Sequence, residues 1–549
     1  MTSNVWRGHL RTSWVYLGVL VVATWVRLTS LGEGFWIDEV MSAAIVSDPW
    51  SLMLTRIGFT DVHPPGYYMV LKAWALLWGE GDLALRSLSM VAGLATLLLV
   101  MHWLRVQTQW SVALLGGALL ACSPFHGHYS VEVRAYALFT LVALGLAWRV
   151  DRWLRDPSSR GLWPIVIIEV LTLGMHYYGL IWVALLNLYV FCTDRLRGRA
   201  WRKEWLKGQC AALAVFAGWL PLLFIQVFEL PAVMKAHLSD ELPVSRILAA
   251  VGPLPSADPS ALAIGVGAVI VTLACVGAWV IRNDEQGEDS GSCHEPSSLT
   301  LGTVLGIALA TLVMPLFALM VLPMSDSLLE AYLRQLPWAY GALVVVASLG
   351  GFAAWMTPSR FRPPMVVWLM IGGPLLVFIL NQLQPMLFLR NLLVFVPLVI
   401  LCACWSLRSA PRWLHVVLTI LVLIAGGLHA DQGSNGFMPR QDFKGATEAL
   451  ASSPKGTIIV APAWDAEGVS RYVASGKTVV PVMSAHEIAS VVRDETSVVV
   501  LLARPERFSL GEAEVEALLG PLWNRQQAMD FRGHRGAMRW ISYRRAGAP

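Results

Sequence analysis

A long series of apolar segments, many close to the length that crosses a bilayer, constrains this chain more than any other feature. About 20 apolar helical residues span the hydrocarbon core, and we count thirteen candidate spans before residue 430. Only 14% of the residues are charged, whereas a soluble globular protein carries about a quarter. The sequence therefore predicts a mostly α-helical, polytopic membrane protein with about 13 transmembrane helices. The predicted spans lie near 13–30, 86–104, 110–123, 133–150, 162–175, 177–193, 209–228, 260–281, 299–322, 335–356, 365–382, 389–407 and 413–429.

Loops rich in Lys and Arg mark the cytoplasmic side of a membrane protein. The clearest is 195–207, and another carries Arg152, Arg155 and Arg160. Counting spans from these loops places residues 31–85 together on the outer face, as one long first loop. Within it, 66–79 is apolar but too short to span, so we expect a helix lying along the membrane surface. The same count places the C-terminal tail outside.

The composition changes after residue 430. Helix-like stretches at 442–452, 466–475, 484–493 and 511–520 alternate with β-branched runs at 457–460, 478–482 and 497–502. We therefore predict a transmembrane domain over 1–430 and a small extracytoplasmic α/β domain over 431–549. The tail has no glycine-rich phosphate loop. The net charge of +4 is dispersed among loops, so we expect no nucleic-acid partner.

The outer face gathers ionisable residues at span ends, and such residues are candidates for function. Cations next to a carboxylate suit two tasks: stabilising charge that develops on a phosphate leaving group, and taking the proton of an attacking hydroxyl. The residues are Asp38, Glu39, His63, Lys72, Arg86, His126, His128, Glu132, Arg134, His176, Arg334 and Arg390.

Each of these residues has a structural explanation when taken alone. The acidic pair could cap or solvate its loop, and the His-Pro-Pro step could simply break the chain. A single Arg could extend to lipid headgroups. His126 and His128 could be metal ligands or ordinary interfacial histidines. Only their common placement favours a shared function.

Several short motifs, in a fixed order along residues 14–430, resemble the GT-C membrane glycosyltransferases. The nearest resemblance is to the glycosyltransferase family 39 type, which includes protein O-mannosyltransferases and lipid A aminoarabinose transferases. The motifs are Trp36-Ile37-Asp38-Glu39, His63-Pro64-Pro65-Gly66-Tyr67-Tyr68, Leu85-Arg86-Ser87-Leu88-Ser89, Ser123-Pro124-Phe125, Glu132-Val133-Arg134-Ala135-Tyr136, His176-Tyr177-Tyr178-Gly179 and Arg390-Asn391-Leu392-Leu393.

The resemblance implies an inverting transfer of a hexosyl or pentosyl group from a polyprenyl-phosphate donor to an acceptor hydroxyl at the outer face. It also implies Asp38 as general base with Glu39 beside it. By the same resemblance, His63 lies near the donor phosphate, and Arg390 lies in a motif in which Asn391 stands where relatives carry an aromatic residue. With these two we group further candidates for binding the donor phosphate and sugar. That set is His63, Tyr67, Arg86, Arg134, His176 and Arg390.

The wider setting implied is the inner membrane of a bacterium, where membrane lipids surround a multi-pass chain. No metal ligand or cofactor is assigned, although the sequence is compatible with a divalent cation. A glycan, a lipid and a protein all remain open as acceptors. Two other functions also remain open: a transporter or flippase of a lipid-linked sugar, and a non-catalytic subunit of a glycan-assembly complex.

Overall fold

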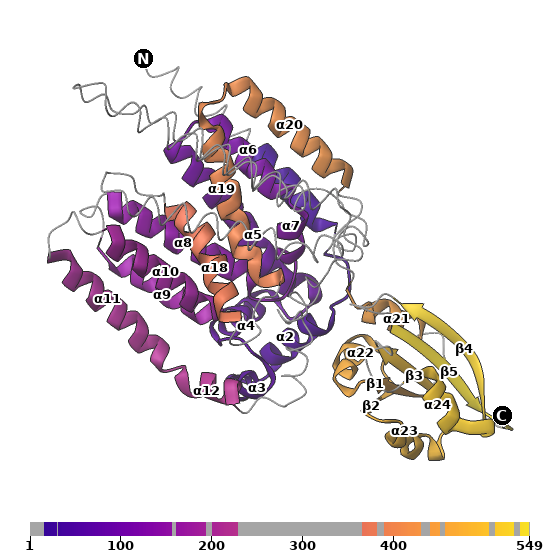
Figure 1. The fold of residues 1–549 in the computed structure, drawn as a ribbon. Coiled ribbons are helices and arrows are strands. Elements are labelled where there is room, and N and C mark those ends of the chain that lie inside the picture. The colour runs from indigo at the N-terminus through magenta and orange to yellow at the C-terminus, as the bar shows by residue number, and fades with distance from the viewer. Residues whose placement is uncertain are drawn as a thin grey trace, which may run out of the picture.

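The computed structural model describes a mostly helical chain with one small sheet (Figure 1). The predicted spans 260–281, 299–322 and 335–356 lie outside the described residues. The described residues are 16–29, 31–155, 161–193, 200–228, 365–381, 389–429, 440–450, 456–503, 511–531 and 538–547.

The helical part is a bundle built around α5 (Asp82–Gln107), which packs against α6 (Trp110–Ala121) and α8 (Tyr136–Arg155). Among the described helices, α5 is the one that is long and apolar enough to cross a membrane, and several shorter apolar helices surround it. The count of thirteen spans therefore stays a prediction. The other bundle helices are α7 (Pro124–Tyr129), α9 (Trp163–Met175), α10 (Tyr178–Thr193), α18 (Met365–Asn381), α19 (Val396–Ser406) and α20 (Arg412–His429).

Two predicted spans are interrupted. The predicted span over 209–228 is divided between two helices, because α11 (Ala200–Ala217) ends and α12 (Leu220–Phe228) begins three residues later. Pro221 has no N–H to donate and would clash with the carbonyl of a preceding helical turn, which disfavours it inside a helix and suits its place in the first turn of α12. The span predicted over 389–407 starts as the 3-10 helix η3 (Leu389–Phe395) before α19.

The first loop contains three helices: α2 (Ile37–Ser47), α3 (Trp50–Thr60) and α4 (Gly66–Trp78). Helix α4 buries Tyr67, Tyr68 and Leu71 on one face and leaves Leu76 and Leu77 more than 70% exposed. This amphipathic division is the one expected of a helix on a membrane surface.

The tail contains a five-stranded sheet of order β2-β1-β3-β5-β4. Strand β1 (Thr457–Ala461) lies parallel to β2 (Thr478–Pro481) and β3 (Ser497–Ala503), and these strands match the predicted runs. Strands β4 (Trp523–Phe531) and β5 (Met538–Arg545) complete the sheet in antiparallel fashion. Neither β4 nor β5 was predicted from the sequence, and β4 is polar and largely exposed.

Four helices accompany the sheet, at the places where helix-like stretches were predicted. Alternate residues of β1 and β3 enter two apolar clusters, so both faces of the sheet are covered. The boundary near residue 430 stays a prediction, since 430–439 are outside the described residues. The helices are α21 (Phe443–Ala449), α22 (Ala466–Tyr472), α23 (Ala485–Val491) and α24 (Glu512–Leu519).

Candidate active site

Asp38 lies in the first turn of α2 and is held by arginines from distant parts of the chain. Arg390 Nη1 donates to Asp38 Oδ2 at 2.9 Å, and Arg134 Nε lies 4.0 Å from the same oxygen. The Asp38 side chain keeps 25% of its surface exposed and that of Arg390 keeps 23%. The pair is therefore accessible to a substrate.

Glu39, the next residue, is fully buried and faces Arg86 of α5. Arg86 Nε and Nη2 donate to the two Glu39 oxygens at 2.8 and 2.5 Å, and the Val133 N–H donates to Oε1 at 3.0 Å. The remaining donors of Arg86 bond the carbonyls of Leu31, Glu33 and Gly34. Both groups are thus saturated by protein partners. This geometry favours a role in holding the loop over direct contact with substrate.

A second buried network surrounds Asp61, a residue that the sequence analysis did not single out. Asp61 accepts from His63 Nδ1 at 2.6 Å, from the Tyr68 hydroxyl at 2.6 Å and from Arg134 Nη1 at 3.1 Å. Burial opposes its ionisation, but Arg134 and His63 outweigh burial and lower the Asp61 pKa below its ordinary range. The sequence feature that could have pointed to Asp61 is its position two residues before His63, which was itself a predicted site residue.

The Asp61 network fixes the histidine ring. Because a carboxylate can only accept, His63 Nδ1 carries the proton and Nε2 of the neutral ring is left as an acceptor. Burial lowers the His63 pKa, and the neighbouring Asp61 charge opposes this. The ring meets His176 edge-on at 5.1 Å between centroids, so two of the predicted site residues are adjacent.

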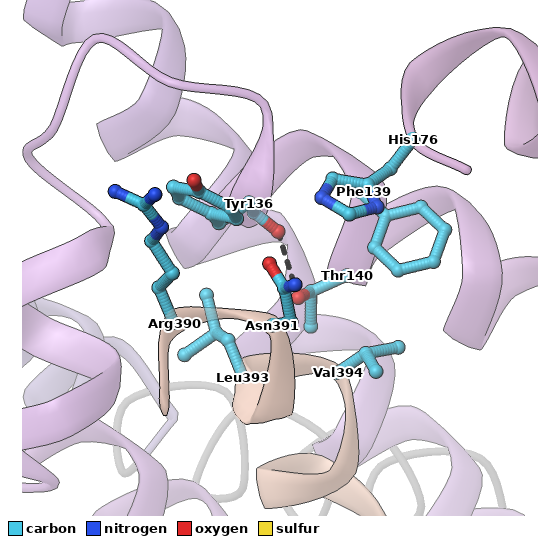
Figure 2. A pocket seen from close by; sticks show the side chains of 8 residues that line it. All are labelled: Tyr136, Phe139, Thr140, His176, Arg390, Asn391, Leu393 and Val394. Atoms are coloured by element: carbon cyan, nitrogen blue, oxygen red, sulfur yellow. Dashed lines mark hydrogen bonds between the residues drawn. The ribbon is translucent and has the colours of Figure 1, made fainter. Parts of the chain in front are cut away.

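A small pocket separates Arg390 from His176 (Figure 2). Tyr136 and Phe139 of α8 line it, together with Asn391 of η3. The Arg390 guanidinium lies 5.9 Å from the Tyr136 ring, whose centroid is 5.9 Å from that of His176. An aromatic wall with a cation at one end suits a sugar face and its phosphate.

Glu132 lies between α7 and α8, and its two oxygens accept no hydrogen bond from the described residues. Burial raises its pKa to about 7, against the opposing charge of Arg440. Arg440 itself donates to the His128 carbonyl at 3.1 Å. Tyr67, predicted to bind the donor, is buried near these charges, and burial keeps its hydroxyl protonated by raising the Tyr67 pKa.

The histidines of α7 do not form a metal site with the described residues. Arg27 Nη2 donates to His126 Nδ1 at 2.8 Å, so that nitrogen already acts as an acceptor. Within the described ranges, no group of three His, Cys, Asp or Glu side chains is placed to hold a metal ion.

The structure thus gathers most of the predicted residues into one region and divides them by environment. Asp38 and Arg390 form a partly exposed pair, with the buried Arg134 behind it and His63 and His176 next to it. Glu39 and Arg86 lie behind it as a closed pair. A helical bundle with three helices in its first loop and an arginine-held carboxylate agrees with what the motif resemblance implies.

Comparison with known proteins supports that class. Residues 62–223 match the family model described as dolichyl-phosphate-mannose-protein mannosyltransferase, so the resemblance read from the motifs is confirmed over this segment. It includes His63, Arg86, Arg134 and His176, whereas Asp38 and Arg390 lie outside it. No curated protein sequence matches the chain.

Two crystal structures of ArnT from Cupriavidus metallidurans are similar in fold. The apo form is 13% identical with a TM-score of 0.44, and the form bound to undecaprenyl phosphate is 14% identical with a TM-score of 0.42. Each alignment covers 97% of this chain and 98% of the other. Because the sequence identity and the TM-scores are this low, neither structure defines the activity of this chain.

Proposed function

We propose that the protein is a membrane glycosyltransferase. It moves a hexosyl or pentosyl group from a polyprenyl-phosphate donor to an acceptor hydroxyl. The family match over 62–223 supports the class, and the motifs around Asp38 and Arg390 extend it beyond that segment. The distribution of Lys and Arg among the loops supports an active site on the extracytoplasmic face of a bacterial inner membrane.

The observation that carries the proposal is the contrast between Asp38 and its neighbouring acids. The Asp38 side chain is 25% exposed, whereas those of Glu39 and Asp61 are 0% and 4% exposed and bonded by the protein. Only a carboxylate that substrate can reach serves as a general base. Asp38 meets this requirement, and the other two serve to build its surroundings.

The reaction follows from these positions. The acceptor oxygen attacks the anomeric carbon, its proton passes to Asp38, and the carbon–oxygen bond to phosphate breaks with its electron pair leaving on the polyprenyl phosphate. A single displacement of this kind inverts the anomeric centre. Arg390 exchanges its bond to Asp38 for the donor phosphate, which frees the base and stabilises the charge on the leaving group.

The test is sugar transfer in membranes from a radiolabelled polyprenyl-phosphate sugar pool, comparing the natural chain with Asp38→Asn. Removing a general base reduces a rate by about 100- to 10,000-fold, and the amide cannot take a proton. The matched control is Asp151→Asn. Asp151 lies near the C-terminal end of α8 and is also paired with an arginine, Arg155, at 3.0 Å. The control should transfer normally.

Three outcomes separate the candidate functions. Loss of transfer in the Asp38 variant alone supports the proposal, and the labelled product identifies the acceptor class. Transfer at the natural rate removes Asp38 from catalysis. Labelled donor that crosses the membrane without being transferred by the natural chain favours the flippase instead.

A further inference from the structure

The tail domain contacts three of the four residues that lead into Asp38, namely Gly34, Phe35 and Ile37. The Phe35 N–H donates to the Tyr472 hydroxyl at 2.6 Å, and the Ile37 N–H donates to Gln441 Oε1 at 3.3 Å. At Gly34, a Cβ would come within 2.5 Å of Lys444 Cβ. Glycine is therefore needed for the two backbones to approach so closely.

Gln441 completes the start of α2 from outside that helix. The first N–H groups of a helix have no partner within it, and the side chain of Trp36, the N-cap residue of α2, makes no capping hydrogen bond. Gln441 accepts from the first of these groups while its Nε2 donates to Asp465 at 3.4 Å. Ile37 also packs against an apolar cluster of the tail domain. The residue before Asp38 is thus held by the tail.

Two residues of α22, Arg471 and Tyr472, bond Asp82 at the start of α5. The Tyr472 hydroxyl donates to Asp82 Oδ2 at 2.6 Å, and Arg471 Nη2 donates to Asp82 Oδ1 at 2.8 Å. The Arg471 guanidinium also lies 4.5 Å from the Phe35 ring. A further ion pair joins Arg56 of α3 to Glu467 of α22 at 2.7 Å.

These contacts bracket the proposed base. Glu39, on one side of Asp38, is fixed by Arg86 of α5. Ile37, on the other side, is fixed by the tail domain, which is itself fixed to Asp82 of the same helix. The Asp38 backbone is therefore held from both directions by groups tied to α5.

We propose that the tail domain is a positioning element of the transferase site, in which Tyr472 and Gln441 orient Asp38 through residues 34–37. This inference rests on the proposed role of Asp38. A catalytic group displaced by about 1 Å loses about 100-fold in rate, so disturbing the contact should lower kcat. It should leave the KM for the donor unchanged, because the hydrogen bonds that Tyr472 and Gln441 make within the described residues reach neither Arg134 nor Arg390.

The experiment compares Tyr472→Phe with Tyr543→Phe, using the full chain in membranes and the same donor. Tyr472→Phe keeps the ring but removes the acceptor for Phe35 and the donor to Asp82. Tyr543 is a matched control, since it is a buried tyrosine of β5 whose hydroxyl has no hydrogen-bond partner among the described residues. We expect kcat to fall 10-fold or more in the first variant, KM to stay within twofold, and the control to behave as the natural chain.

Two further comparisons separate positioning from a general loss of structure. In the Asp38→Asn background, Tyr472→Phe should cause no further loss of the residual rate, because it acts through the missing carboxylate. Arg471→Lys should restore part of the rate lost in Arg471→Ala, since a lysine still reaches Asp82. If Tyr472→Phe does not accumulate, Gln441→Leu takes its place.

The results distinguish the two proposals. A natural kcat in both Tyr472→Phe and Gln441→Leu, with Asp38→Asn inactive, overturns the positioning role and leaves the proposed function standing. A fully active Asp38→Asn overturns the function itself. A rise in donor KM without a change in kcat also contradicts the positioning role.

Discussion

The Arg86–Glu39 pair offers the sharpest test of how this site is built. Both side chains are 0% exposed, and Arg86 also bonds three carbonyls of the loop before α2. Replacing Arg86 by Met leaves the Glu39 charge buried among fewer partners. Removing one partner of a buried ion pair costs about 3–5 kcal/mol, so we expect Arg86→Met to lower the free energy of unfolding by about 4 kcal/mol.

The matched control is Arg155→Met, which removes an exposed arginine from its pair with the less exposed Asp151. Arg155 is 61% exposed and lies one turn from its partner, and such surface pairs contribute about 0–1 kcal/mol. Unfolding of both variants in mixed micelles, titrated with a denaturing detergent and followed by tryptophan fluorescence, gives the two free energies side by side.

A third variant separates the ion pair from the packing around it. Arg86→Met combined with Glu39→Leu removes both charges, and buried pairs replaced by apolar groups are often neutral in stability. The double variant should therefore lose less than the sum of the single variants, by about 2 kcal/mol or more. If Arg86→Met costs no more than Arg155→Met, the pair does not hold the loop, and the reasoning that separates Glu39 from Asp38 is refuted.

Two other predictions concern charge at the site. Burial raises the Glu132 pKa to about 7, so the folded state favours the acid form, and that stabilisation is lost as the pH rises through 7. From the ordinary value of 4.5 this amounts to about 3 kcal/mol. Glu132→Gln should therefore gain stability relative to the natural chain as the pH rises from 5 to 8, when the unfolding of both proteins is measured across that range. Parallel curves would contradict the upward shift, which burial causes against the opposing charge of Arg440. Arg390→Ala should raise the donor KM about 10- to 100-fold, because a charged hydrogen bond to the donor is lost. Donor titration measures this, with Arg412→Ala, a change at an exposed arginine, as the control. An unchanged KM would remove Arg390 from donor binding.

The elements that could be predicted from the sequence are those with a strong local signal. The strands β1, β2 and β3 are β-branched runs, and the helices of the tail follow helix-like stretches, so both were predicted close to their observed bounds. Strand β4 reads Trp-Asn-Arg-Gln-Gln-Ala-Met-Asp-Phe and has neither alternation nor β-branched residues. It is a strand because β5 pairs with it, which no local pattern reveals.

The candidate site shows the same division. Asp38, His63, Arg134 and Arg390 were found because each lies in a short motif at the end of an apolar segment. Asp61 was missed because a single acidic residue before a His-Pro-Pro step resembles a loop residue. Its role depends on Tyr68 and Arg134, and the second of these is 73 positions away.

Chemical type alone could not separate the two adjacent acids of α2. Consecutive residues of a helix point about 100° apart, so Asp38 and Glu39 face different surroundings although they share a turn. The surroundings come from residues that are distant in sequence: Arg390 is 352 positions from Asp38, and Arg86 is 47 from Glu39. A charged side chain that is saturated and buried stabilises a loop, whereas the partly exposed Asp38 and Arg390 are the pair that we propose to meet the substrate. The division between structure and chemistry in this loop is therefore decided by which arginine each acid meets.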